Sequence, residues 1–143
     1  MKLKILFLCT GNSCRSQMAE GYARHFGRDF LEVVSAGIEA HGINSFAIDV
    51  MKEDGVDITS QQSTQLTSEI LKQTDLVITL CGDAEEKCPF LPEGVIKYHW
   101  PIEDPAKISG NNQQILTHFR LVRDKIKTLI NNLVAELRMR HHN

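Results

Sequence analysis

The segment from Cys9 to Ser16 has the residue types of a nucleophile set in an anion-binding loop. It reads Cys-Thr-Gly-Asn-Ser-Cys-Arg-Ser, so five residues separate the first cysteine from Arg15. An apolar run precedes this segment and a helical pattern follows it. A loop that enters a helix in this way directs backbone N–H groups and the positive end of the helix dipole toward one point. That field favours the thiolate of Cys9, to which Ser16 can donate a hydrogen bond.

The ligand that suits this loop is a tetrahedral oxyanion, since the guanidinium of Arg15 can bind two of its oxygens at once. Gly11 and Asn12 tolerate the positive φ that such a loop can need. A buried cysteine beside an unrelated arginine gives the same letters, but the strand–loop–helix order, Gly11 and Ser16 favour a functional loop. The predicted oxyanion-binding residues are Thr10, Gly11, Asn12, Ser13, Cys14 and Arg15.

Three further cysteines follow Cys9, namely Cys14, Cys81 and Cys88. The two pairs are five and seven positions apart by residue number, so neither is the C-x-x-C pair typical of zinc sites. The histidines do not cluster at metal-ligand spacing either, and we predict no metal. In a reducing compartment, cysteines more often have catalytic or redox roles than form a framework of structural disulfides. Cys14 could pair with Cys9 or pack within the loop, and we favour packing.

Composition narrows the class of protein further. The 143 residues suit one domain spanning residues 1–143, and the net charge of −2 argues against nucleic-acid binding driven by overall charge. No stretch has the apolar length of a membrane span. The apolar run near the N-terminus is too short for a signal peptide. We therefore expect a cytoplasmic protein that contacts neither membranes nor nucleic acid.

Hydrophobic periodicity predicts strands that alternate with helices. The predicted strands are 4–8, 31–35, 75–80 and 95–100, and the predicted helices are 16–27, 45–55, 67–73 and 115–137, followed by a frayed tail over 138–143. This alternation indicates an α/β fold with a parallel sheet and helices on both faces. Cys9 and Cys81 each follow a strand, so we expect both at the edge of the sheet where ligands bind.

Several motifs at separate places in the chain resemble those of one protein family, and they occur in the same order as in that family. Cys9–Ser16 resembles the phosphate-binding loop of the low-molecular-weight protein tyrosine phosphatases, and Cys9–Gly21 is similar to the arsenate reductases built on that fold. Further resemblances lie at Ser35–Gly42, Leu80–Asp83, and in His99-Trp100 followed by Asp104-Pro105. The resemblance implies a single-domain three-layer sandwich with a four-stranded parallel sheet in the order 2-1-3-4.

The same resemblance implies that Asp104 is the general acid, because the family places an aspartate followed by proline on a late loop. Pro105 biases Asp104 toward an extended conformation. Glu103 is a weaker alternative for this role. The segment Trp100-Pro101-Ile102 differs from the Trp-Gly-Phe that is common in relatives.

Cys81 and Cys88 match the relay positions of the reductases, which need thiols to supply two electrons. The resemblance implies that Cys81 forms a disulfide with Cys9. Cys88 then attacks Cys81, which frees Cys9 and leaves a Cys81–Cys88 disulfide, and thioredoxin reduces that disulfide. Seven helical residues would separate Cys81 from Cys88 by roughly 10.5 Å along the axis. A disulfide tolerates no more than about 7 Å, so oxidation must remodel this segment.

Alternatives remain open at this point. A phosphatase for phosphotyrosine or a small phosphate ester needs only Cys9, Arg15 and Asp104, and a non-catalytic oxyanion-binding or redox-sensing module is a third possibility. We expect no bound cofactor and a monomer. Asn12, Glu20 and Ser35 match a monovalent-cation site of some relatives, but Thr64 stands where those relatives can carry aspartate, and we favour a structural role. We also expect structural roles for His41 and His99.

Overall fold

The computed structural model describes residues 2–81 and 91–141 of the chain. Its centre is a parallel sheet of β2 (Leu31–Gly37), β1 (Leu3–Cys9), β3 (Leu76–Thr79) and β4 (Ile96–His99), in that spatial order. This order confirms the predicted 2-1-3-4 sheet. The strand ends differ from the predicted ones by at most two residues, which is the usual uncertainty of such boundaries.

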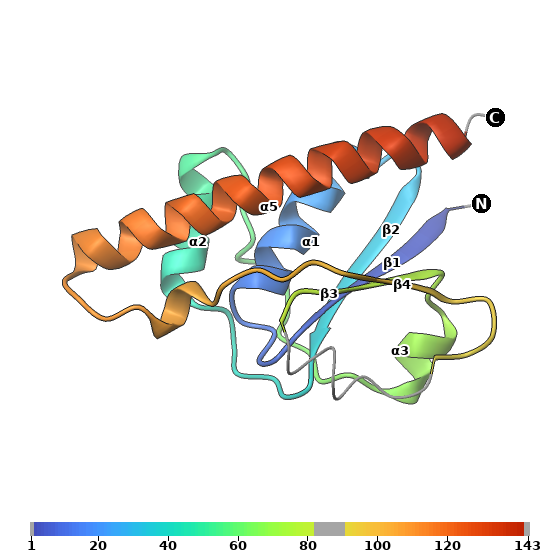
Figure 1. Cartoon of the computed structure of the whole chain (residues 1–143), viewed down its shortest axis with the longest axis horizontal. Helices are drawn as coiled ribbons and strands as arrows, with labels where there is room; N and C mark the ends of the chain where they lie inside the picture. Colours follow the sequence, from blue (N-terminus) through green and yellow to red (C-terminus); the bar gives the residue numbers. More distant parts are fainter. Residues whose placement is uncertain (1, 82–90, 142–143) are drawn as a thin grey trace.

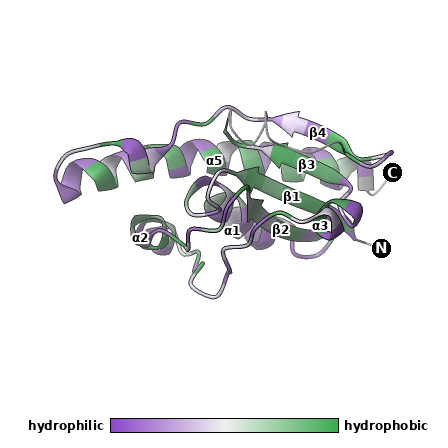
Figure 2. Cartoon of the chain, turned by 90° about the horizontal axis from the view of Figure 1, so that it is seen from below, coloured by the Kyte–Doolittle hydropathy of each residue, from purple (hydrophilic) through white to green (hydrophobic). Residues whose placement is uncertain are grey.

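The central strand β1 is covered on both faces, and its residues Ile5 to Leu8 are fully buried. A strand of this kind needs a continuous apolar run, which is what the sequence has there. Figure 2 shows β1 and β3 as hydrophobic along their length, whereas the edge strand β4 is largely hydrophilic. In the register of the sheet, Leu8 of β1 lies beside Ala36 of β2 and Thr79 of β3, so all three strands end at the same edge.

Helices cover both faces of the sheet, as predicted. The helices α1 (Arg15–Gly27), α2 (Ser45–Glu53) and α5 (Asn112–His141) contact one another on one face, and α3 (Ser68–Lys72) lies on the other face (Figure 1). This arrangement follows from right-handed crossovers, since the chain leaves β1 toward β2 and later returns past β1 to β3.

Two helix starts follow from capping residues. The Asn44 side chain accepts hydrogen bonds from the N–H groups of Phe46 and Ala47, and it begins α2 as predicted. After β4 the chain forms a short 3₁₀ helix, η1 (Pro105–Lys107), in a segment that we predicted to be a plain loop. Asp104 caps this turn by accepting from the N–H of Ala106, and Pro105 suits its first position.

The C-terminal helix is longer than predicted at both ends. Asn111 caps its start by accepting from the N–H of Gln114. The tail after Arg138 was expected to be frayed, but α5 continues to His141. Arg138 is anchored there, because its guanidinium pairs with Asp29, donates to the carbonyl of Phe26 and lies 4.6 Å from the centre of the Phe30 ring. These contacts join the last turns of α5 to the end of α1.

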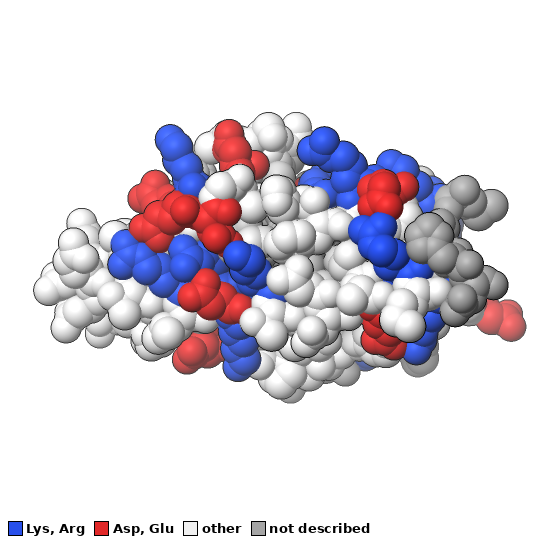
Figure 3. All heavy atoms as spheres, turned by 90° about the horizontal axis from the view of Figure 1, so that it is seen from above, with Lys and Arg blue, Asp and Glu red and all other residues white. Residues whose placement is uncertain are grey.

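Acidic and basic side chains are interleaved on the face of the molecule that carries α5 (Figure 3). Glu53 of α2, for example, binds both Arg120 and Arg123 of α5. These pairs join the two helices, and the described residues of this face form no large patch of one sign. Within residues 2–81 and 91–141, no helix combines the length and the hydropathy needed to cross a membrane.

Candidate active site

The predicted anion-binding loop lies at the edge of the sheet where β1, β2 and β3 end. Cys9 is the last residue of β1, pairs with Gly37 of β2 and is 2% exposed. The loop from Thr10 to Cys14 then leads into α1, which begins at Arg15. The buried strand therefore fixes the cysteine, and the helix fixes the arginine.

A segment that follows β2 runs along the outside of this loop and binds its carbonyl groups. The N–H groups of Ile38, Glu39, His41 and Asn44 donate, in that order, to the carbonyls of Cys9, Thr10, Gly11 and Ser13. The Gln17 side chain donates to the carbonyl of Asn12. Because the C=O and N–H of a trans peptide point in opposite directions, the N–H groups of the loop face inward. The loop therefore has the form of an anion-binding nest.

Two glycines and an asparagine permit this close approach. Asn12 has a φ of 49°, in the positive region that both residues were expected to tolerate, but Gly11 does not have a positive φ. Gly11 is needed for a different reason, since a Cβ there would lie 2.4 Å from Nδ1 of His41. A Cβ on Gly37 would lie 2.2 Å from the carbonyl oxygen of Glu39 and 2.6 Å from the backbone nitrogen of Asn12. Only glycine fits at that crossing of two backbones.

The loop lines a small cavity of about 200 Å³. Its lining residues are Cys9, Thr10, Gly11, Ser13, Cys14, Arg15, His41, Asp104 and Ala106. Most of these were predicted as site residues, but His41 was expected to be structural only. Nothing in its local spacing signals a place in the site, because hydrogen bonds between the Ile38–Asn44 segment and the loop bring it there.

The thiol of Cys9 has a hydrogen-bond partner in Ser16. Sγ of Cys9 lies 2.8 Å from Oγ of Ser16, and Nδ2 of Asn12 donates to the same Ser16 oxygen at 2.8 Å. The Asn12 amide is oriented by the N–H of Thr64, which donates to its Oδ1 at 2.7 Å. Since Ser16 accepts from Asn12, its own hydrogen remains available for Cys9.

Arg15 and Asp104 lie close together at the wall of the loop cavity. One guanidinium nitrogen of Arg15 donates to the carbonyl of Ile102 at 2.9 Å, and the other lies 3.6 Å from Asp104. Asp104 lines the cavity, whereas Glu103 is directed toward His118, 3.6 Å away. This geometry favours Asp104 over Glu103 as a proton donor to a bound oxyanion.

The family model for low molecular weight phosphotyrosine protein phosphatases matches residues 4–143. The chain belongs to this family. An arsenate reductase of Bacillus subtilis is 53% identical over 122 residues, which cover 85% of this chain and 88% of that protein.

Solved structures of the family have the same fold. An arsenate reductase in a phosphate-binding state is 36% identical, with a TM-score of 0.75 over 95% of this chain and 98% of the other. The low molecular weight protein tyrosine phosphatase of T. tengcongensis is 26% identical, with a TM-score of 0.82 over 94% and 99%. The fold therefore serves proteins of both names, and the activity must be argued from the thiols.

Cys81, from a distant part of the chain, is a further cysteine that the fold holds at this phosphatase-type loop. The N–H of Leu80 donates to the carbonyl of Leu8, which places Cys81 just beyond the shared sheet edge. Its Sγ lies 3.0 Å from Oγ1 of Thr10, and the residue is 7% exposed. Cys88 and the predicted remodelling of the 81–88 segment lie outside the described residues.

Cys14 is buried within the loop and is 5% exposed. Burial raises the pKa of its thiol to about 12, although the hydrogen bond with Ser13 opposes this. The thiol is therefore neutral near pH 7 and a weak nucleophile. This state favours the packing role that we predicted for Cys14.

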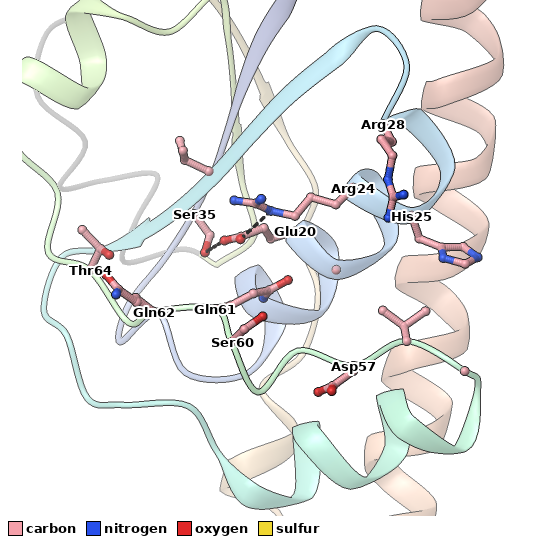
Figure 4. A pocket seen from close by; sticks show the side chains of 14 residues that line it. Glu20, Arg24, His25, Arg28, Ser35, Asp57, Ser60, Gln61, Gln62 and Thr64 are labelled. Carbon is pink, nitrogen blue, oxygen red and sulfur yellow. Dashed lines mark hydrogen bonds and ion pairs between the residues drawn. The ribbon is translucent and has the colours of Figure 1, made fainter.

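The three residues predicted near a cation site do come together behind the loop. Asn12 donates to Ser35 at 2.9 Å, and Ser35 donates to Glu20 at 2.6 Å. Glu20 and Ser35 border a second cavity of about 580 Å³ between α1, β2 and the 55–64 segment (Figure 4). His99 lies elsewhere, with Nδ1 2.8 Å from the hydroxyl of Thr79, and does not line the loop cavity.

Proposed function

We propose that this protein reduces arsenate to arsenite, with Cys9 as nucleophile and Cys81 as the first electron-donating thiol. The observation that carries the proposal is the position of Cys81, buried against the oxyanion loop with its Sγ 3.0 Å from the Thr10 hydroxyl. A phosphatase hydrolyses its covalent intermediate with water and needs no second thiol there. Relatives that are about half identical over most of their length and are named arsenate reductases support the same conclusion.

The first step uses the loop and the acid. Arsenate enters the nest of N–H groups and binds the guanidinium of Arg15, and the Cys9 thiolate attacks arsenic. Asp104, 3.6 Å from Arg15 at the cavity wall, donates a proton to the departing oxygen, which leaves as water. The product is a Cys9–arsenic(V) adduct, whose developing negative charge the N–H groups stabilise.

The second step transfers two electrons. The Cys81 thiolate attacks the sulfur of Cys9, a Cys9–Cys81 disulfide forms, and the electron pair of the sulfur–arsenic bond leaves with arsenic as arsenite. Cys88 then attacks Cys81 and releases the Cys9 thiolate. A thioredoxin-like dithiol reduces the Cys81–Cys88 disulfide by exchange and becomes oxidised itself. Thiols that must return to the reduced state suit the cytoplasm, where we propose that the protein works as a monomer.

Reconstitution with thioredoxin, thioredoxin reductase and NADPH tests this proposal. Addition of arsenate should start NADPH oxidation, and mass spectrometry after one turnover without reductant should find Cys81 linked to Cys88. Active partner proteins without arsenate-dependent NADPH loss would instead support a phosphatase.

The phosphatase is the second candidate because Cys9, Ser16, Arg15 and Asp104 alone suffice for phosphate-ester hydrolysis. Arsenate and phosphate share charge and shape, so weak hydrolysis of an aryl phosphate is expected even from a reductase. The two functions are separated by comparing the catalytic efficiencies of thioredoxin-dependent arsenate reduction and of aryl phosphate hydrolysis in the same preparation.

A further inference from the structure

Glu20 is a buried carboxylate on α1 that lines the second cavity and not the oxyanion-loop cavity, and it is 4% exposed. One of its oxygens accepts from the Ser35 hydroxyl at 2.6 Å, and the other accepts from Nε of Arg24 at 2.8 Å. Figure 4 shows Arg24 reaching from α1 to this carboxylate at the wall of the second cavity. A second guanidinium nitrogen of Arg24 donates to the carbonyl of Val33, so the side chain is fixed at two points.

A chain of hydrogen bonds joins this carboxylate to the nucleophile. The Asn12 amide donates to Ser35 on one side and to Ser16 on the other, and Ser16 in turn contacts Cys9. The direction of each hydrogen bond in this series is fixed. An ionised Glu20 can only accept, so Ser35 donates to it, and the N–H of Thr64 donates to the Asn12 oxygen, so the Asn12 NH₂ group faces the two serines. An ionised Glu20 therefore keeps Ser35 as its donor and holds the Asn12 amide in place.

These residues do not fit a bound monovalent cation. A cation there would have to share the carboxylate oxygens of Glu20 and Oδ1 of Asn12 with the N–H and O–H donors that already bind them. A positive charge is also present already, on the guanidinium of Arg24.

We propose that Arg24 is a positioning residue that acts as a built-in cation, holding Glu20 ionised and thereby fixing the Asn12–Ser16 pair beside the Cys9 thiolate. Burial raises the pKa of Glu20, and the Ser35 hydrogen bond and the charge of Arg24 oppose that rise. Without Arg24, the buried carboxylate must either take a proton or bind a cation from solution. Both outcomes loosen the support of Asn12, and the second makes the protein sensitive to the salt that is present.

The experiment compares the wild type with Arg24→Gln, which removes the charge, and with Arg24→Lys, which retains it. Arg28→Gln is the matched control. This substitution removes the same charge from the same end of α1, and Arg28 lines the same cavity as Arg24 (Figure 4). Among the described residues Arg28 has no hydrogen-bond or ion-pair partner. The readouts are the rate of iodoacetamide alkylation of Cys9 at pH 7, followed by peptide mass spectrometry, and the Tm in potassium chloride and in choline chloride at equal ionic strength.

We expect Arg24→Gln to slow Cys9 alkylation by about fivefold, the effect of one weakened hydrogen bond, and to have a higher Tm in potassium than in choline. Wild type and Arg28→Gln should show the same alkylation rate and no preference for potassium, and Arg24→Lys should recover most of the loss. The proposal is overturned if the wild type itself prefers potassium, or if Arg24→Gln matches Arg28→Gln in both readouts.

Only the link to arsenate turnover rests on the proposed function. The alkylation and Tm readouts need no substrate, so they distinguish the two proposals. A protein that fails to reduce arsenate but shows the Arg24 effect on Cys9 would refute the reductase and leave this inference standing.

Discussion

The Thr10 hydroxyl lies 3.0 Å from Sγ of Cys81, although the two residues are 71 positions apart in the sequence. Thr10 belongs to the oxyanion loop, and Cys81 follows the neighbouring strand of the sheet. The hydroxyl can donate to a thiolate at Cys81, and this would favour attack on the Cys9 sulfur. One residue therefore links the site of the first step to the thiol of the second.

Replacing Thr10 with valine removes this hydrogen bond while keeping the shape of the side chain. We expect Thr10→Val to slow arsenite release in a single turnover by about tenfold, since hydrogen bonds to charged groups contribute about 1.5–3 kcal/mol. Rapid quenching with quantification of arsenite measures this step. Thr10→Ser, which keeps the hydroxyl, is the control and should stay near the wild-type rate. Equal rates for the valine and serine variants would show that the contact does not activate Cys81.

Replacing Cys81 with serine separates the two candidate functions. A serine cannot form the disulfide with Cys9, so we expect arsenate-dependent NADPH oxidation to fall to background. Hydrolysis of an aryl phosphate needs only the loop, Arg15 and Asp104, and it should be retained. Cys14→Ser is a useful companion, because the high pKa of Cys14 leaves it a weak nucleophile and its loss should spare the relay. Arsenate turnover that survives in Cys81→Ser contradicts the proposed electron path.

The fold was predictable because its signals are local. The buried run from Ile5 to Leu8 marks a central strand, and Asn44 marks a helix start through its side-chain cap. The order of the strands came from the resemblance to the family. The 3₁₀ turn at Pro105–Lys107 was missed, because Asp-Pro is equally common in plain turns.

The remaining parts of the site depend on contacts between distant segments. His41 lines the cavity because backbone N–H groups of its segment bind the loop carbonyls, and backbone hydrogen bonds leave no pattern in side-chain types. The spacing of Glu20 and Arg24 allows a pair on one helix face, but only the packing of β2 shows that Glu20 is buried. The anchoring of Arg138 by Asp29 was likewise hidden, since the two residues are 109 positions apart.

The contact between Gly37 and the loop backbone predicts a severe effect of a single methyl group. In Gly37→Ala, the new Cβ meets the backbone of Glu39 and Asn12, neither of which can rotate away as a side chain could. We expect the free energy of unfolding to fall by about 3 kcal/mol, at the upper end of overpacking effects, with loss of oxyanion binding. Urea unfolding measures the change. Gly11→Ala is the comparison: the atoms nearest to its Cβ belong to the His41 side chain, which can move, so it should destabilise the fold less.

Asp54 gives the fold a dependence on acid pH. It accepts the Tyr22 hydroxyl at 2.7 Å and pairs with Lys127 at 2.9 Å, and these two contacts, Lys127 foremost, lower the pKa of its carboxyl. Burial and the Asp54 carboxylate raise the pKa of Tyr22, so the tyrosine stays protonated and donates. A carboxyl whose pKa is lowered by folding stabilises the protein above its ordinary pKa of 3.8, and this stabilisation is lost as the pH falls below that value.

We therefore expect Asp54→Asn to cost about 1 kcal/mol of stability at neutral pH. The difference in Tm between the wild type and this variant should then shrink as the pH is lowered below about 4, because the wild-type carboxyl takes up its proton there. Asp49→Asn is the control, because Asp49 is an exposed carboxylate on α2 with no hydrogen-bond or ion-pair partner among the described residues. Its Tm difference from the wild type should be small at every pH. A gap between wild type and Asp54→Asn that stays constant down to pH 3 would mean that the charge of Asp54 does not contribute.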